Sequence, residues 1–359
     1  MKRAGAAEFR DVVVAIMAGG FGTRFWPLST PRRPKQFLTE LAGESLYTQA
    51  VGRARRLVPP DRIVVVANQV HRRLVREQAP EVCPRNIVCE PRRRDTAAAL
   101  ILAALFVERR WPGHILVNMP SDHLVTGREA FRAAMAAAVA QARQDRLVTL
   151  GIPPTDPATR FGYLELADPP AALKPQRVRR FVEKPPPAKA RQYVASGRWL
   201  WNSGIFIWQA ARLLEEAARH LPETYRALAP LAAHFGRATF ARKARRAFDR
   251  LKAVSIDYGV MERAEEVWVV PAALEWSDLG GWRATEALLR PDKSGNRCAG
   301  RVELKDTRGT LAVTSEGDVM LVAGVADLIV VRGPGGVLVC RKSAADRLKP
   351  LVSRILGET

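Results

Sequence analysis

The stretch MAGGFGTRFWPLSTPRRPKQF at residues 17–37 begins where the apolar, β-branched run VVVAIM at 12–17 ends. The run predicts a buried strand, and the glycines behind it predict a sharp turn. Gly19, Gly20 and Gly22 have no side chain, so backbone N–H groups can approach a phosphate chain that a Cβ would obstruct. The segment therefore predicts a phosphate-binding turn at the end of the first strand.

Two cations in the same segment extend this interpretation. Arg24 and Lys35 would supply fixed positive charge to a triphosphate. The turn lacks the Gly-Lys-Ser/Thr ending of a Walker loop and the third glycine of a dinucleotide-binding loop, so neither class is indicated. Glycine turns also follow strands for purely structural reasons, so the turn alone does not distinguish a phosphate-binding role from a structural one.

Further apolar runs alternate with helical patterns along the first half of the chain. Continuous apolar runs are typical of strands buried on both faces, and strand–helix alternation predicts right-handed crossovers. We expect an α/β fold with a Rossmann-like, mostly parallel sheet, helices on both faces and ligands at the carboxyl ends of the strands. The predicted strands are 12–17, 63–67, 87–89, 115–119 and 147–151, and the predicted helices are 45–57, 70–78, 96–109 and 129–144.

The pattern changes near the carboxyl terminus. Five short strand-like runs recur between 301 and 341 at a spacing of about ten residues, and a helical pattern follows at 344–356. We therefore predict a catalytic domain at 1–290 and a small β-rich domain ending in a helix at 291–359.

Composition narrows the class of protein. The chain has 359 residues and a net charge of +21, but its arginines are spread singly or in short steps along the whole length. No basic module with interleaved aromatic residues accompanies them, so we expect no nucleic-acid partner. No apolar run is long enough to span a membrane. Four cysteines without metal-ligand spacing favour the reducing cytoplasm: Cys83, Cys89, Cys298 and Cys340.

The whole 17–37 segment resembles the signature of the sugar nucleotidyltransferases, and its WPLS and PKQF pieces resemble the mannose-1-phosphate guanylyltransferase branch. Further segments similar to this family follow in the family's order, so the resemblance spans essentially the whole first domain. It implies the family's fold and a β-helix-like C-terminal domain. The segments are CEPRRRDTAAA at 89–99, PSDH at 120–123, FGY at 161–163, FVEKP at 181–185, WNSGIF at 201–206, SIDYGVME at 255–262 and WSDLGGW at 276–282.

The resemblance implies a Mg²⁺ site made by Asp122 and Asp278. Carboxylate oxygens suit Mg²⁺, which takes one or two protein carboxylates and completes its shell with water and phosphate. Taken in isolation, each aspartate would be interpreted as a turn or cap residue.

The resemblance also implies a site for GTP. Glu90 could accept hydrogen bonds from the N1–H and N2 groups of guanine, which is a physical route to base selection, although a solvent-facing glutamate before a proline is an equal alternative. The residues expected to bind the nucleotide are Ala18, Gly19, Gly20, Gly22, Thr23, Arg24, Lys35, Glu90 and Ser121.

Mannose 1-phosphate is the second expected substrate. Lys184 would bind its phosphate, Glu183 and Asn202 its hydroxyl groups, and Gly162 would admit the ring close to the backbone. The alternative is a surface ion pair between Glu183 and Lys184 that contributes almost nothing to stability. We expect Asp257 nearby and assign it no role.

The expected reaction is in-line attack of the sugar phosphate on the α-phosphorus of GTP, with pyrophosphate leaving. The phosphate is already a good nucleophile at neutral pH, so the catalytic residues neutralise charge rather than remove a proton. They are Arg24, Lys35, Asp122, Lys184 and Asp278.

Two departures from the family pattern leave alternatives open. Thr30 stands where the family has arginine after Trp-Pro-Leu-Ser, and Asp95 stands where it has asparagine, which adds negative charge near the expected base site. A different base, another hexose 1-phosphate, or a catalytically silent sugar-nucleotide-binding relative therefore remain alternatives. We also expect a homodimer, and a single activity, since the chain lacks room for the isomerase domain of some relatives.

Overall fold

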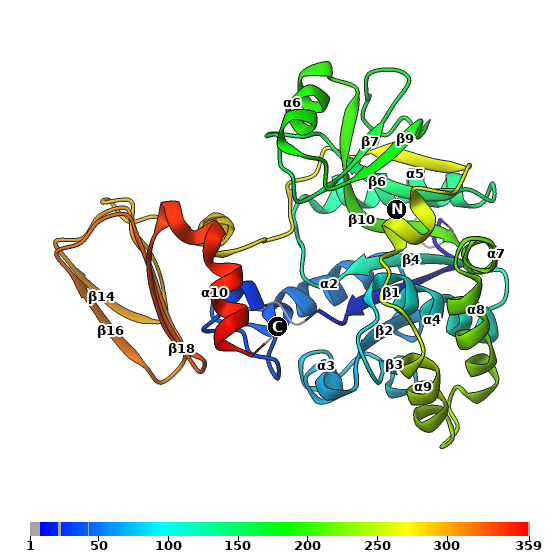
Figure 1. The fold of residues 1–359 in the computed structure, drawn as a ribbon, viewed down its shortest axis with the longest axis horizontal. Helices are drawn as coiled ribbons and strands as arrows, with labels where there is room; N and C mark the ends of the chain where they lie inside the picture. The colour runs from blue at the N-terminus through cyan, green and yellow to red at the C-terminus, as the bar shows by residue number, and fades with distance from the viewer. Residues whose placement is uncertain (1–7, 21–22, 42, 358–359) are drawn as a thin grey trace.

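The computed structural model describes residues 8–20, 23–41 and 43–357. Its core is one ten-stranded sheet in which the main path runs β3-β2-β1-β4-β10-β6-β11-β8, with β7 and β9 attached to β10 (Figure 1). The strands are β1 (Val12–Ala18), β2 (Ile63–Asn68), β3 (Ile87–Glu90), β4 (Ile115–Pro120), β6 (Leu147–Ile152), β7 (Gly162–Glu165), β8 (Gln176–Arg177), β9 (Arg180–Glu183), β10 (Trp199–Gln209) and β11 (Val267–Pro271).

The sheet is mixed in direction. Strands β3, β2, β1 and β4 are parallel, as are β6 and β11, which confirms the parallel core expected from the apolar runs. The long strand β10 runs antiparallel to both β4 and β6 and joins the two parallel parts. Its pairing shifts register between Asn202 and Phe206, so an irregular segment of β10 faces the carboxyl ends of the parallel strands.

Helices cover both faces of the sheet, because its strands are apolar on both sides. In β1, Val12, Val14 and Ile16 belong to one core, and Val13 and Ala15 belong to the other. The first core is covered by α2 (Leu46–Ala54), α3 (Arg72–Gln78), α5 (Arg128–Ala142) and α6 (Pro187–Ser196), and the second by α4 (Asp95–Arg110), α7 (Ala210–His220), α8 (Pro222–Leu228) and α9 (Phe240–Asp249).

None of the helices in the described part of the chain combines the length and the apolar character that a membrane-spanning helix requires.

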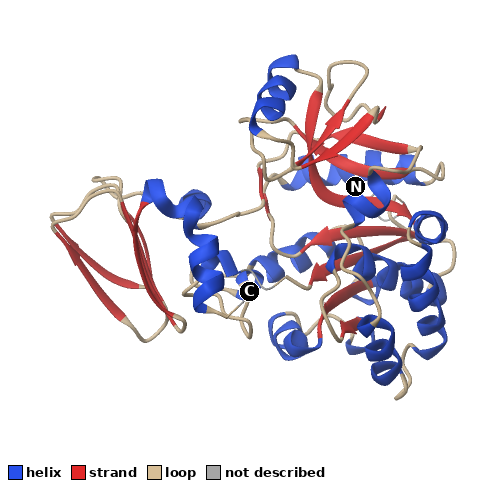
Figure 2. Ribbon diagram, viewed as in Figure 1, coloured by secondary structure: helices blue, strands red, loops and turns tan. Residues whose placement is uncertain are grey.

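A small β-structure follows the ten-stranded sheet and lies to one side of it (Figure 2). Parallel pairing joins β13 to β15 and β15 to β17, and separately β14 to β16, so alternate strands stack in two layers. This is the expected β-helix-like domain. Its strands are β13 (Arg297–Ala299), β14 (Arg301–Lys305), β15 (Leu311–Thr314), β16 (Val319–Ala323), β17 (Leu328–Gly333) and β18 (Gly336–Arg341), followed by the 3-10 helix η9 (Lys342–Arg347) and α10 (Leu348–Ile355).

The two parts share a third core. Trp26, from the signature segment, is buried together with Trp282, which begins the 3-10 helix η8 (Trp282–Leu288), and with Val331 of the β-rich part. The Trp282 indole donates a hydrogen bond to the Trp26 carbonyl at 3.0 Å, and the Gly335 N–H donates to the Pro27 carbonyl at 2.9 Å. The C-terminal part therefore packs directly on the segment that carries Arg24 and Lys35.

Candidate active site

A pocket of about 330 Å³ opens at the carboxyl ends of β1, β3 and β4. Ligand sites in open α/β sheets lie at this edge. The predicted site residues Gly19, Gly20, Glu90, Ser121 and Asp122 line it together with Asp257.

Gln36 holds the glycine turn in place. Its side-chain amide donates to the Ala18 carbonyl at 3.2 Å and to the Gly20 carbonyl at 2.8 Å. The predicted residue Gly22 lies outside the described residues. Gln36 belongs to the PKQF piece of the signature, but its role as a brace was not predicted because it depends on a fold-back of the chain over 16 residues.

Arg24 and Thr23 begin the 3-10 helix η1 (Thr23–Phe25). The Arg24 guanidinium is exposed and donates to the Gly280 carbonyl at 3.4 Å. Arg24 thus joins the segment that follows the glycine turn to the WSDLGGW loop, while its guanidinium stays exposed.

Lys35 connects the two predicted metal ligands. It starts the 3-10 helix η2 (Lys35–Phe37) and is 7% exposed. Its Nζ lies 2.9 Å from an oxygen of the Asp122 carboxylate and donates to the backbone carbonyl of Asp278 at 2.7 Å. A buried ammonium needs such partners, since its desolvation is costly. Lys35 therefore brings Asp122 and Asp278 together.

The donor set fits a divalent ion. The Asp278 oxygen Oδ1 is buried and accepts no hydrogen bond from the described residues, while the Arg160 guanidinium lies 3.6 Å away. No cluster of three or more carboxylate, histidine or cysteine ligands occurs within the described ranges. Two carboxylates with open positions for water and phosphate match the preference of Mg²⁺.

Asp122 is held in its ionised form. Burial by itself raises the pKa of this carboxyl, but the positive charge of Lys35, the charge of His123 once that imidazole is protonated at low pH, and the hydrogen bond from Lys35 outweigh it and lower the pKa to about 2. An oxygen ligand that stays charged throughout the physiological range is suited to binding a cation.

Glu90 behaves in the opposite way. It ends β3, is 5% exposed, and its Oε1 has no hydrogen-bond partner in the described part of the chain. Burial raises the pKa of Glu90 to about 8, only partly opposed by Arg93. A Cβ on Gly19 would lie 3.2 Å from its other oxygen. Glu90 thus faces the glycine turn, and its solvent-facing alternative is wrong.

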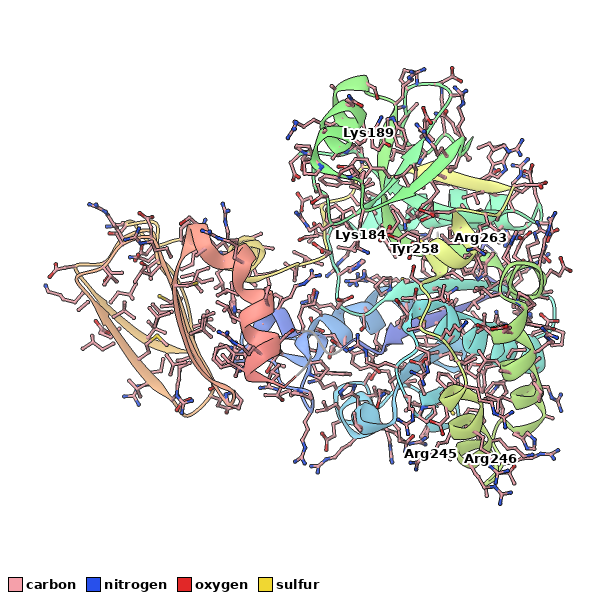
Figure 3. The ribbon with its side chains drawn as sticks, in the orientation of Figure 1. Lys184, Lys189, Arg245, Arg246, Tyr258 and Arg263 are labelled. Atoms are coloured by element: carbon pink, nitrogen blue, oxygen red, sulfur yellow. The ribbon has the colours of Figure 1, made fainter. Side chains whose placement is uncertain are left out.

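The predicted sugar residues lie together on β7, β9 and β10. Gly162 pairs with Glu183 across the β7–β9 ladder, and a Cβ on Gly162 would lie 2.5 Å from a Glu183 carboxylate oxygen. Lys184 contacts the other Glu183 oxygen at 2.5 Å, and Figure 3 shows it beside Tyr258. The Glu183 side chain is 9% exposed and that of Lys184 is 56% exposed, so the carboxylate of this pair is buried while its ammonium group is open to solvent.

Asn202 links this group to Asp257. Its amide nitrogen donates to an Asp257 oxygen at 3.0 Å, and its carbonyl oxygen accepts from the Thr149 hydroxyl at 2.8 Å. Burial, followed by the negative charge of Glu183, raises the pKa of Asp257 to about 7. Asp257 begins the π-helix η7 (Asp257–Met261), so the expectation that it lies nearby is met.

His123 is a site residue that was not singled out beforehand. Its Nδ1 accepts a hydrogen bond from the Trp276 indole at 3.2 Å, which leaves the proton on Nε2, and Nε2 lies 3.7 Å from Asp122. Burial lowers the pKa of His123. The family-like PSDH motif includes His123 and could have indicated it as a site residue. Its tautomer is fixed by the contact with Trp276, which only the folded chain provides.

The two departures from the family pattern lie in different places. Asp95 starts α4 with a φ of 62°, accepts from the Thr96 N–H at 2.7 Å, and lines the same pocket as Glu90. Thr30 forms an isolated bridge with Arg33 and is absent from the residues that line the pocket. Of the two departures, Asp95 alone adds charge to the pocket lining.

The fold and the site define an α/β nucleotidyltransferase: a glycine turn, two carboxylates and a buried lysine meet at the carboxyl edge of the sheet. Residues 13–291 match the model of the nucleotidyl transferase family, and residues 300–355 match that of the MannoseP isomerase/GMP-like beta-helix domain. The chain belongs to the nucleotidyl transferase family, in the branch that includes mannose-1-phosphate guanylyltransferases. Enzymes of this family generally use a divalent metal ion.

Three relatives illustrate the similarity. Over 348 residues the chain is 38% identical to "Xanthan biosynthesis protein XanB" of Xanthomonas campestris pv. campestris, covering 96% of this chain and 73% of the relative. It is 36% identical over 351 residues, with the same coverage, to "Mannose-1-phosphate guanylyltransferase" of Escherichia coli. A solved structure titled "mannose-1-phosphate geranyltransferase" from Thermus thermophilus superposes with a TM-score of 0.84 at 34% identity, covering 96% of this chain and 99% of that one.

Proposed function

We propose that the protein transfers the guanylyl group of GTP to mannose 1-phosphate, giving GDP-mannose and pyrophosphate. The observation that carries the proposal is the contact of Lys35 with both Asp122 and the Asp278 loop beside the glycine turn. This arrangement concentrates positive charge and metal-binding oxygens where a triphosphate would lie. The similarity to relatives named for this activity supports the choice of substrates.

The nucleotide half of the site would act by positioning and charge neutralisation. The glycine turn would receive the phosphate chain, and Arg24 and Lys35 would offset the charge that develops on the leaving pyrophosphate. Asp122 and Asp278 would hold Mg²⁺, which when bound would polarise the phosphoryl oxygens. Glu90 would accept hydrogen bonds from the N1–H and N2 groups of guanine, and adenine cannot donate this pair of hydrogen bonds.

The sugar half of the site would orient the nucleophile. Lys184 would bind the phosphate of mannose 1-phosphate, while Glu183 and Asn202 would bind ring hydroxyls beside Gly162. The pKa of Lys184 is raised: burial opposes its charge, but the hydrogen bond and charge of Glu183 outweigh burial. Lys184 therefore stays cationic, and the sugar phosphate can attack the α-phosphorus without a general base.

Pyrophosphate release by the purified protein tests this proposal. The assay uses four nucleoside triphosphates, each combined with mannose, glucose or galactosamine 1-phosphate, in the presence of Mg²⁺. We expect turnover confined to GTP with mannose 1-phosphate. Turnover with another pair would keep the mechanism and reject the substrates, and binding without turnover on any pair would favour a silent relative.

We further propose a homodimer in the cytoplasm. Four apolar side chains on β16 and β18 are more than half exposed, which is unusual for strands of a solitary domain. All four cysteines are free thiols, in accord with a reducing compartment. Light scattering tests the dimer, with a single monomer mass as the contrary result. The exposed side chains are Val319 at 63%, Leu321 at 70%, Val337 at 56% and Val339 at 60%.

A further inference from the structure

A groove outside the proposed active site runs along the outer edge of β3. A hollow of about 1370 Å³ extends from Arg85, before β3, to Arg92, after it, with α9 on its other side. A second hollow of about 620 Å³ along α3 continues it. We call this combined feature the edge groove. The two hollows share the lining residues Gln69, Val70, Arg72 and Pro84.

The edge groove is strongly cationic. Its larger hollow is lined by seven arginines and by no aspartate or glutamate. Asp249, just outside the lining, pairs with Arg92 at 2.5 Å. The other six arginines form no ion pair within the described ranges: Arg72, Arg85, Arg109, Arg110, Arg237 and Arg245. Figure 3 labels Arg245 on α9, which Figure 1 shows next to β3.

The edge groove also contains a strand edge that pairs with no further strand among the described residues, and the residues of this strand, 87–90, are 4–7% exposed. β3 is the last strand of the sheet and pairs only with β2. In the described part of the chain, one backbone hydrogen bond joins residues 87–90 to a segment other than β2, the local bond from the Ile87 N–H to the Pro84 carbonyl. An unpaired strand edge presents N–H and C=O groups at the spacing that another strand requires.

We propose that the edge groove binds an acidic peptide segment of a partner protein, which adds to the sheet as a strand beside β3. Peptide backbone would pair with the open edge, and its carboxylates would meet arginine side chains, which bind carboxylates in bidentate fashion. A nucleic acid fits less well, because its backbone cannot satisfy a strand edge and the phenylalanines of the groove pack on one another. Phe235 lies 5.1 Å from Phe106 and 5.2 Å from Phe240 between ring centres.

Fluorescence anisotropy with a labelled ten-residue peptide of alternating glutamate and valine tests the proposal on the full chain. We expect saturable binding that weakens at least about tenfold in the double variant Arg85→Glu, Arg245→Glu. The matched control is Arg301→Glu, which reverses an exposed charge on β14, far from the groove. Neither variant touches the proposed active site, so both should keep wild-type pyrophosphate release, which also verifies folding.

Backbone pairing is tested separately from charge. The same peptide with alternate amide nitrogens methylated keeps every carboxylate but cannot pair as a strand, and we expect it to bind at least about tenfold more weakly. Equal binding of the two peptides would overturn strand addition. Tighter binding of a ten-nucleotide single-stranded RNA, lost in the same double variant, would overturn the peptide in favour of nucleic acid. Absence of peptide binding in an active enzyme would overturn this proposal alone.

Discussion

At the scale of the residue, the carboxyl group of Glu90 combines burial with an unpaired oxygen. Its pKa is about 8 in the folded protein and near its ordinary value of 4.5 in the unfolded chain. The folded state therefore binds a proton that the unfolded state has lost between these values. The free energy of unfolding is highest below the unfolded pKa and decreases as pH rises through 8.

We predict that Glu90→Gln removes this decrease. The melting temperature of the variant minus that of wild type should be larger at about pH 8 than at about pH 5, because glutamine needs no proton. Thermal unfolding at both pH values measures it. A constant difference between variant and wild type would contradict the raised pKa.

Glu90 also provides a test of base recognition. If the carboxylate accepts hydrogen bonds from guanine, GTP binding near neutral pH must release its proton. Calorimetric titration in buffers of different ionisation enthalpy should show this release in wild type and its loss in Glu90→Gln. If wild type binds GTP without releasing a proton, the guanine base does not bind to the Glu90 carboxylate.

Substitution of the two candidate metal ligands should lower turnover to a similar extent but should affect the stability of the protein differently. Asp122→Asn and Asp278→Asn should each lower turnover by about two orders of magnitude or more, as both remove a charged oxygen ligand. Only Asp122→Asn should also lower the melting temperature, because it removes the carboxylate that pairs with the buried Lys35. In Asp278→Asn, Lys35 keeps its partner at this position, which is the backbone carbonyl.

Pyrophosphate release and thermal unfolding of the two variants test this difference, with Asp168→Asn as a control at an exposed position. Near-normal turnover at saturating Mg²⁺ would remove either residue from the metal site. Equal loss of stability in both variants would contradict the asymmetric role of Lys35.

At the scale of the element, strand β7 approaches β9 so closely that a side chain at 162 would press on the Glu183 carboxylate. In Gly162→Ala the new methyl group would fall 2.5 Å from a Glu183 oxygen and 3.2 Å from the Phe181 ring. The flexible carboxylate must move, so we predict an increase in KM for mannose 1-phosphate of about tenfold with a smaller change for GTP.

The matched control is Gly52→Ala, where an added Cβ meets nothing within 4 Å. Gly52 lies inside α2, and alanine there should stabilise the protein by about 0.5–1 kcal/mol without kinetic effect. Steady-state kinetics with each substrate varied separately distinguishes the two variants. An increase confined to the KM for GTP would separate Gly162 from the sugar site.

At the scale of the whole molecule, the β-rich C-terminal part supports the signature segment. A Cβ on Gly333 would lie 2.6 Å from the Pro27 carbonyl oxygen, which is backbone and cannot move freely. We predict that Gly333→Ala destabilises the protein by about 1–3 kcal/mol and lowers turnover, because the segment carrying Arg24 and Lys35 must shift.

Thermal unfolding and pyrophosphate release of Gly333→Ala measure this coupling. Lost stability with unchanged kinetics would mean that the shared core holds the two parts together without influencing the site. The boundary at 290/291 between the two proposed domains remains a prediction, and Trp282 shows that residues before it already belong to the shared core.

Local patterns in the chain were sufficient to predict the strands of the parallel core and the helices on both faces. Apolar periodicity is a property of neighbouring residues, and a strand such as β1 is apolar on both faces wherever it packs. The glycine turn was equally predictable, as glycine is required by backbone geometry within a few residues. The family motifs identified the candidate residues but not their contacts.

Only the tertiary structure decided how those residues act on one another. Lys35 contacts Asp278 across 243 residues of chain, and Asn202 contacts Asp257 through an irregularity in β10 that periodicity does not reveal. The pKa values of Glu90 and Asp257 depend on desolvation, which exists only after long-range packing has removed water. The shared core and the edge groove likewise arise from segments that meet only in the folded chain.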